Sequence, residues 1–307
     1  MRFIDADQVR ALGPVAATRA LVAALQSGLD PAASPPRIPV DLPAGHLLLM
    51  PAHDDVVAGV KLVTVAPDNP ARGLPRIQAA YLLFDGSTLG LQAVIDGTAL
   101  TTLRTPAVTM ASILPFLPIH PVSCVIVGAG PQAIGHAEAL AAHTPLASLT
   151  FLVREFREVL QARTATLPSG AGQLPITSGA ATDALARAEV VVCATSAREP
   201  VFDSAVLRTD VIVAAVGSHE PDARELDSQL MARATIVVED VDTALREAGD
   251  VTLAVAEGAV DPDRLIGLAS LVREGVRPEH PGPIVVKTVG MAWEDLVVAR
   301  ACAELAS

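Results

Sequence analysis

The chain has 307 residues and a formal net charge of −12, and 51% of its residues are apolar although only 3% are aromatic. This length predicts two domains of ordinary size. Cores built from Ala, Val, Leu and Ile suit buried parallel strands covered by helices. The negative charge excludes nucleic acid and anionic membranes as expected partners, because both would repel the chain.

The first thirty residues predict a short strand at Arg2–Ile4 and then an amphipathic helix with Asp5 as its N-cap. The acidic start lacks a long apolar run, so we expect no signal peptide. Charges, Pro and Gly interrupt every apolar run before it could span a membrane. Without CxxC or metal-ligand spacing, we expect no metal site and a cytoplasmic protein with three buried thiols, Cys124, Cys193 and Cys302.

The next segment, residues 31–45, is rich in proline and contains Arg37. Strand-like runs follow it, and Asp85-Gly86-Ser87 between the last two is a hairpin turn signal. A helix rich in Ala and Thr is predicted at Thr98–Leu114. The strands are predicted at His46–Pro51, Gly59–Val65, Ala79–Phe84 and Leu89–Ile95.

Residues 122–136, VSCVIVGAGPQAIGH, combine an apolar run, a glycine turn and the start of a helix. Gly128 would make the turn, and Gly130 would let the backbone approach a dinucleotide pyrophosphate. Ala133 takes the third small position, after Pro131 and Gln132 at the helix start, where helix and strand pack closely. Read alone, the motif also fits an ordinary glycine turn between a buried strand and a helix.

The pattern after the glycine turn alternates as βαβ units do. Five or six strands after one such turn fit a Rossmann-type doubly wound parallel sheet, and this context predicts that a dinucleotide binds at the turn. The strands are expected at Val122–Val127, Ser148–Val153, Val190–Ala194, Val211–Val216, Thr235–Val238 and Ile284–Lys287, and a last helix from Met291 to Leu305.

The end of the second strand indicates which cofactor binds. An acidic residue there binds the ribose of NAD, whereas an arginine accommodates the 2′-phosphate of NADP. The strand SLTFLV is followed by Arg154, whose guanidinium offers forked donors suited to phosphate. Glu155 would place a carboxylate at the ribose if the register shifted by one residue. We expect NADPH, with NADH possible.

Three basic residues of the first half stand among apolar or small neighbours, namely Arg37, Lys61 and Arg104. A lysine in the middle of a β-branched strand is costly unless it reaches solvent or a counter-anion. The three residues together predict a carboxylate-binding pocket, although each could also be an unrelated surface residue.

The chain resembles the ornithine cyclodeaminase/mu-crystallin family along nearly its whole length. The resemblance implies that Arg37, Lys61 and Arg104 bind the substrate carboxylate, with Lys61 near the reacting nitrogen. It also implies a homodimer, and it favours NADPH because mu-crystallin-like members carry an arginine where Arg154 falls. The motifs that carry it are LLLMPA, VKLVTVAPDN, RGLPRIQAAYLLFDGSTLGLQAVIDG, TLRTPA, VGAGPQA, GSHEPDARELD and VVKTVGMAWEDL.

The resemblance also implies how the chain divides. Residues 116–287 would form the Rossmann dinucleotide-binding domain. Residues 1–115 plus 288–307 would form an α+β domain for substrate binding and dimerisation. Thr195, Thr288 and Gly290 are expected in the cofactor site, and Asp295 could either line the substrate site or cap the last helix.

One motif departs from the cyclodeaminase pattern. Ornithine cyclodeaminases carry an aspartate two residues after the glycine of GSHEPDARELD, where this chain has His219, and Asp222 replaces a glycine after Pro221. Without that carboxylate, release of ammonia with cyclisation is not expected. The chain is most similar to ketimine reductases of the family, in particular Δ1-pyrroline-2-carboxylate reductases.

We therefore expect NAD(P)H-dependent reduction of a small cyclic imino acid. Δ1-Pyrroline-2-carboxylate would give L-proline, and Δ1-piperideine-2-carboxylate would give L-pipecolate. Lys61 is the first candidate proton source and His219 the second, because histidine titrates near neutrality.

Two other interpretations stay open. One is an ornithine cyclodeaminase or an oxidoreductase similar to alanine dehydrogenase on the same scaffold. The other is a non-catalytic protein of the crystallin type that binds NADPH and a ligand. The presence of Arg37, Lys61 and Arg104 together argues against the second.

Overall fold

The computed structural model describes residues 1–165, 167, 171–275 and 282–306, and the chain forms two compact units. Unit 1 comprises Met1–Val108 and Met291–Ser307, and unit 2 comprises Thr109–Gly290. The division between the two units falls inside helix α2 (Gly97–Ile113). The second half of α2 belongs to unit 2, where the Thr109 hydroxyl lies 2.9 Å from the His136 ring.

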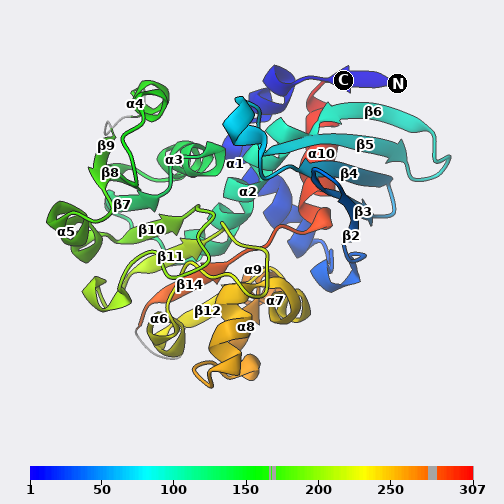
Figure 1. The fold of residues 1–307 in the computed structure, drawn as a ribbon. Coiled ribbons are helices and arrows are strands. Elements are labelled where there is room, and N and C mark those ends of the chain that lie inside the picture. The colour runs from blue at the N-terminus through cyan, green and yellow to red at the C-terminus, as the bar shows by residue number, and fades with distance from the viewer. Residues whose placement is uncertain (166, 168–170, 276–281, 307) are drawn as a thin grey trace. The chain divides into compact units, whose positions relative to one another are not determined.

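Unit 1 is built on a six-stranded sheet with the order β1-β6-β5-β4-β3-β2 (Figure 1). Strands β2 to β6 form an antiparallel meander, and β1 pairs with β6 in parallel. The strands are β1 (Arg2–Ile4), β2 (Ile38–Leu42), β3 (Gly45–His53), β4 (Val57–Val65), β5 (Ile77–Asp85) and β6 (Leu91–Asp96).

The four predicted strands of this meander are confirmed, with small shifts at their ends. The last one begins at Leu91 instead of Leu89, because Leu89 has a positive φ of 56° within the turn after Asp85. Strand β2 was not predicted. It is an exposed edge strand that contains Pro39. Proline within a short run argues against a strand when the sequence is read, but the edge of a sheet tolerates it.

Helices cover one face of this sheet. Helix α1 (Ala6–Gln26) packs against α10 (Ala292–Leu305), and α10 in turn contacts β3, β4 and β5 (Figure 1). The predicted cap of α1 is confirmed, since the Asp5 carboxylate accepts the amides of Asp7 and Gln8, and the Gln8 side chain accepts the Asp5 amide.

The alternation along β4 decides which of its side chains lie in the core. Val57, Gly59, Lys61 and Val63 are buried, whereas the residues between them are half-exposed. Successive side chains of a strand point to opposite faces, so Lys61 must share the covered face with its apolar neighbours. The strand pattern itself therefore buries this lysine.

Unit 2 is an eight-stranded parallel sheet with the order β13-β12-β14-β11-β10-β7-β8-β9, and this confirms the Rossmann-type fold. The strand order reverses between β7 and β10, and ligands of such sheets bind outside the carboxyl ends at this point. The strands are β7 (Val122–Val127), β8 (Leu146–Val153), β9 (Gly172–Pro175), β10 (Val190–Cys193), β11 (Ile212–Ala215), β12 (Thr235–Val238), β13 (Leu265–Gly267) and β14 (Ile284–Lys287).

The expectation of five or six strands in this unit was too low. The two missed strands lie at the edges of the sheet. Strand β9, GQLP, includes Pro175, and β13 has only three residues, so neither gives a recognisable apolar run. Helices accompany the strands (Figure 1): α3 (Pro131–His143), α4 (Glu158–Thr164), α5 (Gly179–Arg187), α6 (Ser228–Arg233), α7 (Val241–Glu247), α8 (Gly249–Ala256) and α9 (Leu268–Glu274).

The central strands of unit 2 are buried along their whole length, as the composition predicted. Strands β10 and β11, with the sequences VVVC and IVAA, contribute only small and branched side chains. All three cysteines are free and buried, which confirms that expectation. Burial raises the pKa of Cys124 to about 12 and that of Cys302 to about 11, so both thiols stay protonated.

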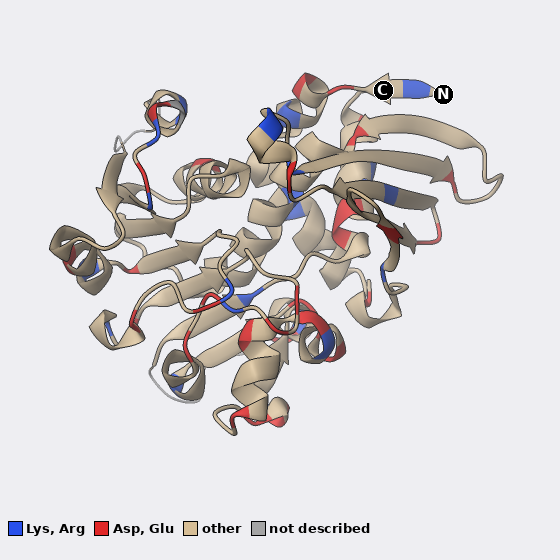
Figure 2. Cartoon of the chain, in the orientation of Figure 1, with Lys and Arg blue, Asp and Glu red and all other residues tan. Residues whose placement is uncertain are grey.

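Acidic residues gather on α7, α8 and the segment that follows them, whereas basic residues are scattered (Figure 2). An anionic ligand must therefore be bound by individual cations placed close to it. Within the described ranges, none of the helices is both long and apolar enough to cross a membrane.

Candidate active site

Two cations and two carboxylates form a buried cluster in unit 1, which we call the charge quartet. It consists of Lys61 from β4, Arg104 from α2, and Glu294 and Asp295 from the first turn of α10. Lys61 Nζ donates to Asp295 Oδ2 at 2.7 Å, and Arg104 Nε donates to Asp295 Oδ1 at 3.2 Å. Arg104 Nη1 donates to Glu294 Oε2 at 2.6 Å. Asp295 thus joins the two cations.

All four side chains of the charge quartet are buried, so the charge of each one affects the protonation of the others. Lys61 is 2% exposed and Arg104 is 5% exposed, whereas Glu294 and Asp295 are fully buried. Burial lowers the pKa of Lys61 from 10.5 to about 8, because loss of water disfavours the ammonium form. The charge of Asp295 opposes this effect, and that of Arg104 adds to it. Lys61 is therefore a cation that can release its proton near neutral pH.

A tyrosine hydroxyl without a hydrogen-bond partner among the described residues belongs to the same face of the sheet. Tyr81 pairs directly with Lys61 across β4 and β5, so the two side chains point the same way. A Cβ on Gly59 would lie 2.2 Å from the Tyr81 hydroxyl, so glycine is required there. Burial, then the charges of Asp295 and Asp54, raise the pKa of Tyr81.

The structure brings together two of the three predicted carboxylate ligands, Lys61 and Arg104. The Asp295 carboxylate binds both cations and is not the cap of α10, whose N-cap is Met291, and its place in a substrate site stays a prediction. Glu294 was missed. Two adjacent acids in the apolar helix AWEDLVVARACAEL were a signal, since buried carboxylates need cationic partners.

The third predicted ligand, Arg37, is half-buried and directly precedes β2. Ile38 pairs with Leu49, so the next position in register places Arg37 beside Met50, and Met50 pairs with Lys61. Arg37 therefore falls on the row of the sheet that contains Lys61, two strand spacings or about 10 Å away. Its contact with a ligand stays a prediction.

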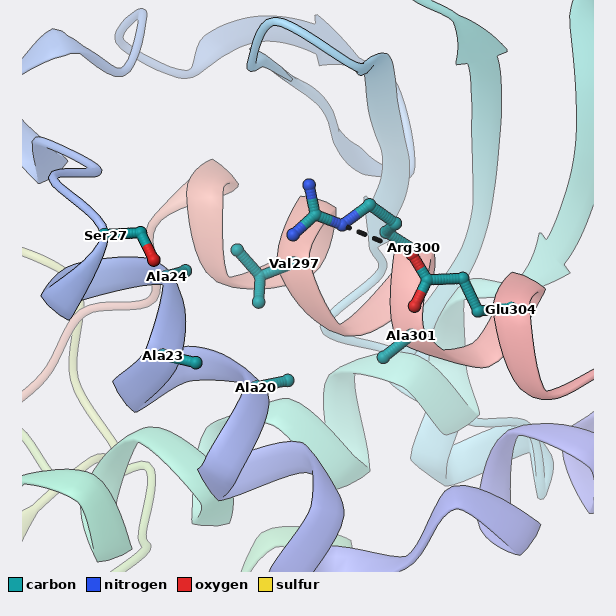
Figure 3. A pocket seen from close by; sticks show the side chains of 8 residues that line it. All are labelled: Ala20, Ala23, Ala24, Ser27, Val297, Arg300, Ala301 and Glu304. Carbon is teal, nitrogen blue, oxygen red and sulfur yellow. Dashed lines mark ion pairs between the residues drawn. The ribbon is translucent and has the colours of Figure 1, made fainter.

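A groove between α1 and α10 lies elsewhere in unit 1 (Figure 3). Small side chains from α1 face α10 across it, and Arg300 of α10 pairs with Asp54 at 2.6 Å and with Glu304 at 3.7 Å. The lining residues are Ala20, Ala23, Ala24, Ser27, Val297, Arg300, Ala301 and Glu304.

The glycine turn of unit 2 has the geometry that a dinucleotide site needs. Gly128 has a φ of 125°, and a Cβ there would lie 2.5 Å from the carbonyl oxygen of Ala194. Gly130 is the N-cap of α3, yet a Cβ on it would meet no atom within 4 Å. The chain's own packing therefore requires glycine at 128 but leaves open space at 130, where a pyrophosphate would approach the backbone. Ala133 is fully buried, as its position in the motif predicts.

Arg154 directly follows β8 and is exposed, and so is Glu155. The predicted strand end at Val153 is confirmed, which places the arginine first after the strand. Which of the two side chains meets the adenosine ribose stays a prediction.

Glu225 anchors the loops that follow β10 and β11. Its carboxylate accepts the amide and the hydroxyl of Thr195, at 2.8 and 2.7 Å, and the amide of Gly217 at 2.8 Å. The Thr195 hydroxyl also accepts the amide of Ala197. Thr195 is thus at the expected edge of the sheet, with its hydroxyl engaged within the protein.

A second buried lysine continues this network. Lys287 Nζ donates to the carbonyl of Ser218 at 2.7 Å and lies 3.0 Å from Asp250 Oδ2. Asp250 Oδ1 accepts the amides of Glu225 and Leu226, both at 2.8 Å. Sequence reasoning missed this trio of Glu225, Asp250 and Lys287, because its members are far apart along the chain.

His219 is exposed and lies in the loop that the trio holds. Arg198 pairs with Glu220 and Asp222, and the Thr252 hydroxyl donates to the carbonyl of Pro221 at 2.6 Å. Asp222, which departs from the cyclodeaminase pattern, therefore has a local role as a partner of Arg198. Residues on both sides of His219 thus make contacts with other elements, and these contacts fix the conformation of the loop.

The end of β14 carries the other predicted cofactor residues. The Glu239 carboxylate accepts the amides of Val289, at 2.8 Å, and Gly290, at 3.0 Å, and Gly290 has a φ of 79°. Thr288 is buried, and its amide donates to the carbonyl of Ala215. These residues therefore lie at the carboxyl edge of the sheet, on the ligand side of such folds.

Comparison with known proteins places these observations in a family. The model of the ornithine cyclodeaminase/mu-crystallin family matches residues 10–307. The chain is 38% identical over 270 residues to the Δ1-pyrroline-2-carboxylate reductase 2 of Burkholderia ambifaria, covering 87% of this chain and 83% of the relative. It is 35% identical over 268 residues to the Δ1-pyrroline-2-carboxylate/Δ1-piperideine-2-carboxylate reductase of Azospirillum brasilense, with the same coverage.

Solved structures agree with this. The Δ1-pyrroline-2-carboxylate reductase of Thermococcus litoralis, in complex with NADH and L-proline, superposes with a TM-score of 0.88 at 25% identity, covering 100% of this chain and 97% of that one. An archaeal alanine dehydrogenase dimer with bound NAD gives a TM-score of 0.85 at 26% identity, covering 99% and 95%. The chain therefore belongs to the ornithine cyclodeaminase/mu-crystallin family and is an NAD(P)-dependent oxidoreductase of the imine-reductase type.

Proposed function

We propose that this protein reduces Δ1-pyrroline-2-carboxylate to L-proline, and Δ1-piperideine-2-carboxylate to L-pipecolate, with NADPH. The observation that carries the proposal is the buried Lys61, a cation with a pKa of about 8 held beside a second buried cation, Arg104. The names of the relatives support the substrate class. A small imine with one carboxylate needs both a cationic clamp and a proton, and Lys61 can serve both needs.

Arg37, Lys61 and Arg104 would bind the substrate carboxylate. Arg37 and Lys61 lie on one row of the sheet, about 10 Å apart at the backbone, and their long side chains can converge on one small anion. A bidentate contact from an arginine would fix the orientation of the ring, and orientation is a large part of the catalytic effect for such a small substrate.

The proton would come from Lys61. Reduction of a C=N bond adds a hydride to carbon and leaves the electron pair on nitrogen, so the nitrogen must carry a proton. An ammonium with a pKa of about 8 is charged at neutral pH and is acidic enough to share its proton with an imine nitrogen. His219 is the second candidate.

The residues at the carboxyl edge of unit 2 would bind the cofactor. The pyrophosphate would lie over Gly128, Gly130, Pro131, Gln132 and Ala133, at the start of α3. When bound, NAD(P)H supplies the hydride.

The nicotinamide end would lie near Thr195, Thr288 and Gly290. The preference for NADPH rests on Arg154, the first residue after β8, whose guanidinium would pair with the 2′-phosphate.

A homodimer is part of the proposal. The sheet face of unit 1 opposite Lys61 carries apolar side chains that are half-exposed or exposed. Exposed apolar surfaces of this kind mark interaction sites. A second copy of the chain is the occupant we propose, since a solved relative is a dimer. The face comprises Ile38, Val40, Leu47, Leu49, Val60, Leu62, Leu82 and Val94.

One panel of assays tests the reaction. Purified protein is mixed with NADPH or NADH and, in turn, Δ1-pyrroline-2-carboxylate, Δ1-piperideine-2-carboxylate and pyruvate with ammonia, and ornithine is offered with NAD. We expect oxidation of the cofactor by the two cyclic imines. Failure of both imines would refute the proposal, and ammonia release from ornithine would favour a cyclodeaminase. Turnover that is unchanged in Lys61→Met would exclude Lys61 as the proton source.

A further inference from the structure

The chain contains only two lysines, Lys61 and Lys287, beside twenty arginines. Both lysines are buried, at 2% and 1% exposure, and each pairs with an aspartate from another element. Arginine thus fills every other basic position. Arginine cannot be deprotonated in a protein, whereas a buried lysine shifts its pKa readily. Lysine at position 61 therefore supplies a buried cation that is able to lose its proton, which arginine in the same place could not do.

The partners of Lys61 are unequal. Asp295 Oδ2 accepts the Lys61 hydrogen bond at 2.7 Å, and its other oxygen accepts from Arg104. Glu294 accepts from Arg104 Nη1 and from the amide of Met291, and its charge favours the ammonium form of Lys61 less than that of Asp295 does. Of these two adjacent, fully buried carboxylates of one helix turn, Asp295 is the one that accepts the hydrogen bond from Lys61.

We propose that Asp295 is a positioning residue for the reduction. Its carboxylate fixes the Lys61 ammonium against Arg104 and keeps the lysine protonated until the imine nitrogen takes the proton. The inference rests on the proposed function, because it assigns the proton to Lys61. Asp295 itself need not touch the substrate.

The charges around Lys61 set the expected sign. Asp295 and Glu294 of α10 favour the ammonium form, Arg104 of α2 opposes it, and Tyr81 of β5 is neutral with a raised pKa. Neutralising Asp295 removes the largest favourable charge, so the Lys61 pKa must fall below its value of about 8. Loss of an adjacent opposite charge typically moves a pKa by about one to three units.

The test compares Asp295→Asn with Glu294→Gln, which is matched in burial, helix turn and loss of charge. Reduction of Δ1-pyrroline-2-carboxylate is followed across pH at saturating NADPH. The rate should fall above the Lys61 pKa, and in Asp295→Asn this alkaline limb should move at least about one pH unit lower. Glu294→Gln should move the limb less and should mainly raise KM, because it loosens Arg104.

A second measurement does not depend on turnover. With lysine labelled with ¹³C at Cε, the folded protein gives two lysine signals, and Lys61→Met assigns them. The Lys61 signal should titrate near pH 8 in the wild-type chain and lower in Asp295→Asn. Asp295→Glu, which keeps the charge, should retain the wild-type alkaline limb even if kcat changes.

The outcomes separate the two proposals. If the wild-type chain reduces no cyclic imine, the proposed function fails, while the lysine titration still tests the Asp295–Lys61 coupling. If the wild-type chain is active but the limb and the titration midpoint are the same in Asp295→Asn, the positioning role is refuted. An alkaline limb that is the same in both chains would instead reflect the ionisation of the substrate.

Discussion

Adding a methyl group to each glycine of the dinucleotide turn should affect different properties: NADPH affinity at Gly130 and folding stability at Gly128. At Gly130 the φ of −82° suits alanine, and a Cβ meets no protein atom within 4 Å. Alanine is a poorer N-cap than glycine, by up to about 1 kcal/mol, but it lowers the entropy of the unfolded chain by about 0.4–1 kcal/mol in free-energy terms. The stability of Gly130→Ala should thus stay within about 1 kcal/mol of wild type. The open space is where the pyrophosphate must approach, so NADPH affinity should fall at least tenfold, or about 1.4 kcal/mol.

Gly128→Ala is the matched comparison. Its φ of 125° costs a non-glycine residue about 1–3 kcal/mol, and the new Cβ would lie 2.5 Å from the Ala194 carbonyl. This variant should unfold at a temperature several degrees lower, since about 1 kcal/mol corresponds to roughly 2–4 °C for a unit of this size. Thermal unfolding without cofactor and NADPH titration by fluorescence measure the two effects. A Gly130→Ala variant that binds NADPH as tightly as wild type would refute the placement of the pyrophosphate.

Three further predictions concern other parts of the chain. Arg154→Ala should raise the KM for NADPH much more than that for NADH in steady-state assays, and equal effects would contradict the 2′-phosphate contact. Burial lowers the pKa of His136 from 6.5 to about 4, so this residue's stabilising contribution is present above pH 6.5 and is lost as the pH falls toward 4. Urea unfolding at about pH 8 and about pH 5 should show that wild type loses about 2 kcal/mol more than His136→Gln, and equal losses would count against the buried neutral imidazole. Leu62→Glu, on the sheet face of unit 1 opposite Lys61, should yield monomers in sedimentation experiments, while Leu305→Glu, at the exposed end of α10, should remain dimeric. If both variants are dimers, that sheet face is not the dimer interface.

Short sequence patterns were enough to predict most of the strands and the main turns of both units. The Asp5 cap, the glycine turn and the β-branched strands are signals contained within a few consecutive residues, and the structure has them where the sequence indicated. The edge strands β2 and β9 were missed because each is short and contains a proline, Pro39 within β2 and Pro175 at the end of β9, and edges tolerate proline where central strands do not.

The buried charge networks depend on long-range contacts, so sequence patterns could not fully define them. Lys61 bonds Asp295, 234 residues further along the chain, and Lys287 bonds the carbonyl of Ser218, 69 residues earlier. An apolar strand with a single lysine requires a partner carboxylate but cannot say which one. The scarcity of lysine in the sequence was a usable signal, since a chain that uses arginine almost everywhere keeps lysine at two buried positions.

Hydride transfer to the ring carbon is the central claim, and an isotope label tests it most directly. The protein is incubated with Δ1-pyrroline-2-carboxylate and NADPH carrying deuterium at the transferable C4 position, and the product is analysed by mass spectrometry. We predict L-proline with one deuterium at its α-carbon, formed in step with cofactor oxidation and abolished in Lys61→Met. Unlabelled proline, or no proline despite a bound cofactor, would contradict the account.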